Sequence, residues 1–240
     1  MRPKHTLFVL WLGLSLVLPL IAGETESPWR IVSDTDGIII ENRMLENSRL
    51  KQLRARCEIA APVEVIYEVM DDADSFHEWF GDCLLQKNIT RINEYEKICY
   101  HVVDMPWPFK DRDSVSRVVT RADWDKKEVE THIQSIREMD KAAFWGMNPE
   151  TEKNDRVRIS VMDAVFTYQR LSPNRSMFTY VVMVDPDISL PAWLLNALSV
   201  NQPRTTLENL RRQVKKEIYW EMAGARHGKA FSPDKENVRG

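Results

Sequence analysis

The chain has 240 residues, of which 43% are hydrophobic and 29% are charged, a composition that predicts a folded globular core. This length suits one domain with short appendages. The formal net charge of -3 argues against nucleic acid as a partner, because nucleic-acid binding favours a strongly basic face.

Residues 1–23 have the pattern of an export signal. A short basic start is followed by Thr6 to Ala22, which is apolar apart from three residues. We expect cleavage near Ala22 or Gly23 and a periplasmic or secreted protein. The alternative is an uncleaved N-terminal anchor, although about 16 apolar residues are short for a membrane span of ~20. Either reading places the domain outside the cytoplasm.

The next part of the chain alternates strand patterns with turn signals and then changes to helical spacing. Asp34-Thr35-Asp36-Gly37 is a strong turn signal, and Pro62 opens a helix with an apolar stripe. The expected elements are strands at 29–33, 37–44 and 50–59, a helix from 62 to 70 and a short helix at 76–80.

Six further strands are predicted before the last helix, separated by Pro, Asn and Gly-containing breakers. They are expected at residues 83–92, 96–103, 114–121, 128–135, 157–171 and 175–184. Strands, then helices, then a meander and a final helix give an α+β architecture, in which an antiparallel sheet wraps around one terminal helix.

The terminal helix is predicted over residues 185–216, with Pro191 in its first turn. Its apolar face comprises Trp193, Leu194, Ala197, Leu198, Leu207, Leu210, Val214 and Ile218. Such a face packs against the chain's own sheet or against a ligand held between helix and sheet. From residue 221 to residue 240 the apolar periodicity is lost, and we expect a disordered tail.

Several segments, in order, resemble the START domains, the lipid-binding branch of the Bet v 1-like (SRPBCC) helix-grip superfamily. The resemblance covers roughly Trp29 to Tyr219 and suggests a bacterial-type single-domain member. The segments that match are Ala61 to Met70, Trp79-Phe80, Asp104 to Phe109 with Arg112-Asp113, Val157 to Ile159, and the terminal helix with its Asp-Pro turn, Trp193, Asn196, Gln202-Pro203, Thr206-Leu207 and Leu210-Arg211.

The resemblance implies a helix-grip fold, in which a curved antiparallel sheet encloses a tunnel for one lipid or sterol-like ligand beneath the C-terminal helix. A methionine-rich composition suits such an adaptable apolar lining. The candidate ligand-binding residues are Trp107, Phe109, Met162, Asp163, Phe166, Trp193, Leu194, Ala197 and Leu198.

Asp163 is the one charged residue of this set, and its orientation stays open. If Val161 and Val165 face inward, Asp163 is a carboxylate in an apolar wall and requires a partner. If Met162 and Phe166 face inward, Asp163 is exposed.

No metal, cofactor or catalytic site is predicted. The five histidines show no metal-binding spacing, and the three cysteines form no CxxC pair, so at most one disulfide is possible. A helix-grip enzyme of the cyclase or hydrolase type is the alternative function. It requires at least one convergent inward pair, such as a histidine with a carboxylate, and the only candidates on predicted strands are His101, His132 and Asp163. A third possibility is an interaction protein with a collapsed cavity.

The favoured function is to bind a hydrophobic molecule, and to carry it between membranes through transient membrane contact. We expect a monomer, because the sequence shows no heptad repeat or exposed strand pattern that would favour oligomerisation.

Overall fold

The computed structural model describes residues 27–45, 51–136, 156–159, 161–185, 191, 193–194 and 197–231. The predicted leader at 1–23 and the final part of the predicted tail, 232–240, lie outside these residues. Within the described part, no helix combines the length and the apolar character needed to cross a membrane.

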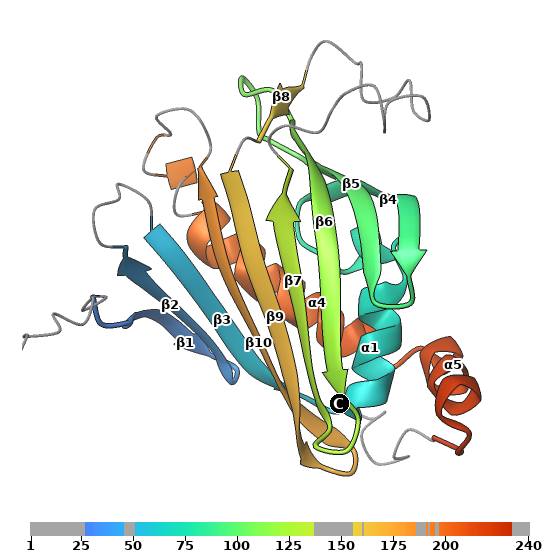
Figure 1. Ribbon diagram of the computed structural model, residues 1–240. Helices are drawn as coiled ribbons and strands as arrows, with labels where there is room; N and C mark the ends of the chain where they lie inside the picture. Colours follow the sequence, from blue (N-terminus) through green and yellow to red (C-terminus); the bar gives the residue numbers. More distant parts are fainter. Residues whose placement is uncertain are drawn as a thin grey trace, which may run out of the picture.

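In the described part of the chain, ten strands form one curved sheet with the order β1-β2-β3-β10-β9-β7-β6-β5-β4, and β8 pairs in parallel with β6 (Figure 1). The strands are β1 (Arg30–Thr35), β2 (Ile38–Met44), β3 (Lys51–Ile59), β4 (Cys83–Asn93), β5 (Glu96–Val103), β6 (Arg112–Asp123), β7 (Glu128–Ser135), β8 (Val157–Arg158), β9 (Val161–Ser172) and β10 (Arg175–Asp185). All neighbours along the main order are antiparallel.

The strands follow the alternation that a half-buried sheet requires. On β3, Leu53, Ala55 and Cys57 are buried while the residues between them are partly exposed. The β1–β2 hairpin turns at Asp36 and Gly37, whose φ angles of 54° and 69° are both positive. Two positive φ angles match a tight primed turn, which favours glycine.

The helices lie on one face of the sheet (Figure 1). They are α1 (Val63–Asp71), the 3-10 turn η1 (Phe76–Glu78), the π-helical segment η4 (Ala197–Asn201), α4 (Gln202–Gln213) and α5 (Glu217–His227). All residues of α1 from Val63 to Met70 are buried, because α1 contacts β7 and β9 on one side and α5 on another. The inner face of α4 buries Leu207 and Leu210.

The predicted fold class is confirmed: an antiparallel sheet grips a C-terminal helix. Two elements differ in detail. The single strand predicted at 157–171 is divided into β8 and β9. Within the described residues of the predicted terminal helix, the π-helical segment η4 directly precedes α4. The chain turns before α5, so Ile218 is 52% exposed and does not continue the apolar face.

The prediction of disorder from residue 221 is wrong for residues 221–231, which continue α5 and the turn after it. Tyr219 and Trp220 are buried, and two cations reach carboxylates buried on α1. Arg226 Nε donates to Glu68 Oε1 at 2.6 Å, and Lys229 Nζ donates to Glu64 Oε1 at 3.1 Å. The weak apolar periodicity concealed this helix because ion pairs to α1 add to the burial of only three apolar side chains, Tyr219, Trp220 and Ala223.

Candidate functional site

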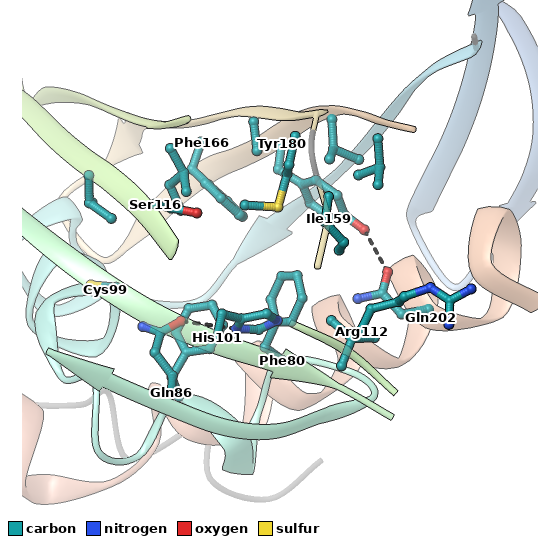
Figure 2. A pocket seen from close by; sticks show the side chains of 18 of the residues that line it. Phe80, Gln86, Cys99, His101, Arg112, Ser116, Ile159, Phe166, Tyr180 and Gln202 are labelled. Atoms are coloured by element: carbon teal, nitrogen blue, oxygen red, sulfur yellow. Dashed lines mark hydrogen bonds between the residues drawn. The ribbon is translucent and has the colours of Figure 1, made fainter. Parts of the chain in front are cut away.

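A cavity of about 270 Å³ lies between the inner face of the sheet and the helical layer (Figure 2). Strands β3, β5, β6, β7, β9 and β10 contribute to its wall, together with the segment from η1 to Phe80 and the start of the η4–α4 helix. The cavity therefore occupies the position that the helix-grip architecture predicts.

Strand alternation decides which residues reach the cavity. On β9, Met162, Ala164 and Phe166 line it. On β5 the more polar parity faces inward, with Lys97, Cys99, His101 and Val103 on the lining. The more apolar parity of β5, Ile98, Tyr100 and Val102, belongs instead to a second apolar cluster with Val115. Hydrophobicity alone would have assigned the β5 faces the wrong way round.

Aromatic rings frame the middle of the cavity. Phe80 and Phe166 approach from opposite sides in Figure 2, with ring centroids 6.5 Å apart. Tyr180 stacks on Phe166 at 5.5 Å. These rings present apolar faces to the space between them, which suits an apolar ligand rather than a polar one.

His101 is a buried polar residue of the cavity wall whose pKa is shifted by its surroundings. Its Nδ1 lies 3.3 Å from Gln86 Oε1 and 3.7 Å from Cys83 Sγ. Burial lowers the pKa of His101 to about 4, so the imidazole is neutral at pH 7. A neutral ring held by an amide contributes a polar group to the wall without adding charge.

The start of α4 is fixed to the loop after η1. Gln202 Nε2 donates to the Gly81 carbonyl at 3.1 Å, and the Gly81 N–H donates to Thr206 Oγ1 at 3.0 Å. A Cβ at Gly81 would lie 2.9 Å from the Gln202 carbonyl oxygen, so this close approach requires glycine. Gln202 also meets the Tyr180 hydroxyl, whose oxygen lies 3.4 Å from Oε1.

All three cysteines are free thiols, and only Cys99 lines the cavity. Burial raises the pKa of Cys99 to about 11, and its Sγ donates to Asn88 Oδ1 at 3.3 Å. The one disulfide that the sequence allowed is therefore not formed. Among the described residues, no group of three or more His, Cys, Asp or Glu side chains could hold a metal ion.

Of the nine predicted ligand-binding residues, Met162, Phe166 and Leu198 lie on the cavity wall. Leu198 belongs to the π-helical segment η4, a type of irregularity that often marks functional sites.

The other apolar candidates do not line the cavity. Trp107 is 91% exposed and Trp193 is 56% exposed. Leu194 is buried, and Phe109 and Ala197 are half-buried, but none of these three belongs to the wall. Helical spacing predicted a common apolar face from Trp193 onward, but the π-helical segment Ala197–Asn201 departs from α-helical spacing.

The assignment of Asp163 to the cavity is wrong. Met162 and Ala164 face inward, so Asp163 lies on the outer face of the sheet. There, its Oδ1 is 3.1 Å from His132 Nε2, and each side chain is 37% exposed. The histidine and carboxylate that a catalytic role required do meet, but outside the cavity.

Arg112 is a cavity residue that the sequence did not predict, although it lies in the Arg112-Asp113 pair of the family resemblance. Arg112 lies on the wall and is only 5% exposed. Its Nη1 donates to the Lys110 carbonyl, and its Nε is buried without a partner. The available signal was alternation along β6, which places Arg112, Ser116 and Val118 on one face.

Comparison with known proteins gives one family. The family model with the description START domain matches residues 20–215 of this chain. An uncharacterized protein of Pseudomonas aeruginosa is 26% identical over 190 residues, which cover 78% of this chain and 87% of that protein. The human START domain-containing protein 10 is 25% identical over 179 residues, covering 73% of this chain and 57% of that protein.

A solved structure, the STAR-related lipid transfer protein fragment from Xanthomonas axonopodis, superimposes with a TM-score of 0.65 at 23% identity. The match covers 78% of this chain and 99% of that fragment. This similarity concerns the fold.

Proposed function

Because this chain belongs to the START domain family, we propose that it binds one hydrophobic molecule, a lipid or sterol-like ligand, in the cavity beneath α4. The observation that carries the proposal is the cavity of about 270 Å³, framed by Phe80, Phe166 and Tyr180. Removal of apolar ligand surface from water, at ~25 cal/mol per Å², supplies the driving force.

Transfer of this ligand between membranes is the second part of the proposal. It is supported by the similarity to a fold whose solved representative is named a lipid transfer protein. We propose that the chain acts as a monomer through transient membrane contact. The basic and apolar residues 1–23 support export, so the site of action is the periplasm or the extracellular space.

A binding role has more support than catalysis. Among the described residues, the lining of the cavity contains no carboxylate that could pair with His101 as an acid–base couple. The His132–Asp163 pair faces away from any apolar substrate in the cavity.

The test combines ligand recovery with a blocked cavity. Protein purified from cells is examined by native mass spectrometry and lipid extraction, and the delipidated protein is titrated with a fluorescent lipid. Ala164→Phe places a ring in the cavity and should reduce binding at least tenfold. Val165→Phe, on the outer face of the same strand, is the matched control and should bind normally.

Absence of both a co-purifying hydrophobic molecule and fluorescent-lipid binding in the wild-type protein would refute the binding role. Transfer is measured separately, as movement of the same lipid between donor and acceptor vesicles. Export is tested by fractionation and by the mass of the mature N-terminus.

A further inference from the structure

The cavity wall is electrostatically one-sided. Among the described lining residues three are cationic, Lys51, Lys97 and Arg112, and none is Asp or Glu. The chain as a whole has more acidic than basic residues, 36 against 33, so composition does not explain this bias. The distribution indicates that the cavity favours negative charge.

Two of the three cationic side chains do not require a bound anion to balance or solvate their charge. Lys97 Nζ lies 3.0 Å from Asp71 Oδ1 and 2.9 Å from the Asp71 carbonyl oxygen, so its charge is balanced from outside the wall. Lys51 is exposed to solvent at the start of β3. Arg112 is different because it is both buried and without an ion-pair partner among the described residues.

The carboxylates nearest to Arg112 in sequence are already occupied. Asp113 Oδ1 accepts from Arg158 Nε at 2.6 Å, and its Oδ2 accepts from Arg158 Nη2 at 3.0 Å and from the Tyr100 hydroxyl at 2.9 Å. Asp111 Oδ1 accepts from the Met105 N–H at 3.1 Å. Neither of these acids neutralises the guanidinium of Arg112.

A buried guanidinium with one carbonyl partner is costly in the free protein, since charge in a poorly hydrated site requires a counter-charge. A carboxylate or phosphate supplies one, and the planar Nε edge of arginine matches two anionic oxygens. Figure 2 shows Arg112 at the same end of the view as Gln202 and the Tyr180 hydroxyl, with the aromatic rings extending away from it.

We propose that the ligand of this cavity is an anionic amphiphile with a single hydrocarbon chain, whose carboxylate or phosphate monoester accepts hydrogen bonds from Arg112. This inference rests on the proposed binding function and specifies its ligand class. The chain of the ligand lies beside Phe80 and Phe166, in the apolar part of the wall.

The size of the cavity supports one chain rather than two. Its volume of about 270 Å³ lies just below the range of small-molecule sites, roughly 300–1,000 Å³. A two-chain phospholipid would have to displace a large part of the surrounding side chains, whereas one chain beside the rings would displace fewer.

The experiment compares ligands that share one chain and differ in head group. Delipidated full-length protein is titrated with oleate, oleoyl lysophosphatidate and neutral monoolein, each below its micelle concentration, and with acetate and inorganic phosphate alone. The variants are Arg112→Met, Arg112→Lys and, as control, Arg117→Met, which alters an exposed arginine on the same strand.

The two anionic lipids should bind at least tenfold more tightly than monoolein. Arg112→Met should weaken anionic binding by about 10- to 100-fold, as expected for a lost charge-assisted contact, and leave monoolein unchanged. Arg112→Lys should retain part of the preference, and Arg117→Met all of it. Acetate and phosphate alone should bind far more weakly than the lipids.

Equal affinity for neutral and anionic lipids, or anionic binding that Arg112→Met leaves intact, would overturn the ligand class while leaving the binding function standing. Phosphate binding as tightly as lysophosphatidate would likewise overturn it. Failure of every lipid, monoolein included, would refute the proposed function itself. If Arg112→Met does not fold, the test is decided by the preference of the wild-type protein for anionic lipids over monoolein and by the partial loss of that preference in Arg112→Lys.

Discussion

The inner face of β9 passes from a solid region of the molecule to a hollow one. Tyr168 stacks on Phe178 with ring centroids 6.1 Å apart, and both belong to the large buried core that includes α1. Phe166 and Met162, which precede Tyr168 on the same face of β9, line the cavity. Bulky residues occur in both regions, so the hollow arises from where the helices lie rather than from smaller side chains.

The largest contrast is expected from large-to-small substitutions in the two regions. Phe178→Ala should reduce the free energy of unfolding by about 3–5 kcal/mol, because it creates a void in packed surroundings. Met162→Ala should cost about 1 kcal/mol or less, because Met162 already borders empty space. Urea unfolding of the ligand-free proteins measures both; similar losses would contradict the distinction.

Acid should lower the stability of the protein through His101, which lies in the cavity wall. The pKa of His101 falls from 6.5 to about 4 on burial, so the unfolded chain takes up the proton first as the pH drops. Above pH 6.5, protonation of His101 does not affect stability. Between pH 6.5 and pH 4 it lowers the free energy of unfolding progressively, by up to about 3 kcal/mol.

His101→Gln should remove this part of the acid sensitivity, measured as the change in unfolding free energy between pH 7 and pH 4.5. A wild-type-like slope in His101→Gln would mean that the imidazole is not held neutral.

Alkylation can distinguish the two regions by accessibility. Cys99 lines the cavity, whereas Cys57 belongs to the packed core, and burial raises the pKa of each thiol to about 11. Ligand at ten times its dissociation constant should slow labelling of Cys99 about tenfold and leave Cys57 unaffected. Mass spectrometry of modified peptides follows both sites; equal protection would point to global stabilisation instead.

The smallest effect is expected on the outer face. Asp163→Asn breaks a half-exposed pair with His132 and should change the free energy of unfolding by less than about 0.5 kcal/mol. Lipid affinity should stay at the wild-type value, because Asp163 points away from the cavity. Loss of binding in this variant would require a different ligand site.

Much of the fold could be predicted because local patterns and global architecture agree. The turn at Asp36-Gly37, the alternation on β3 and the apolar face of α4 each identify an element from a few residues. Prediction fails for an element whose attachment to the domain does not depend on apolar periodicity. Segment α5 is attached by Arg226 and Lys229 to acids far away in sequence, and no local pattern shows such pairing.

The cavity residues were harder to predict than the fold for a related reason. Met162 and Phe166 were predicted because they are apolar on a predicted strand, but Trp107, a loop residue taken from the family resemblance, is exposed. Arg112 and His101 were missed as lining because charge and polarity normally indicate solvent. Their burial depends on strand parity and on the neighbours across the sheet, which sequence alone did not settle.

The attachment of α5 bears on where this domain can be cut. The stretch matched by the family ends at residue 215, just before α5 begins. A chain shortened there would keep every residue of the cavity wall, yet it would strip Glu68 of Arg226 and Glu64 of Lys229. Glu64 would keep its ion pair with Lys127, but Glu68 would lose Arg226. The uncovered side of α1 would then favour partial unfolding or aggregation, so a chain trimmed to the family match alone would represent the whole protein poorly.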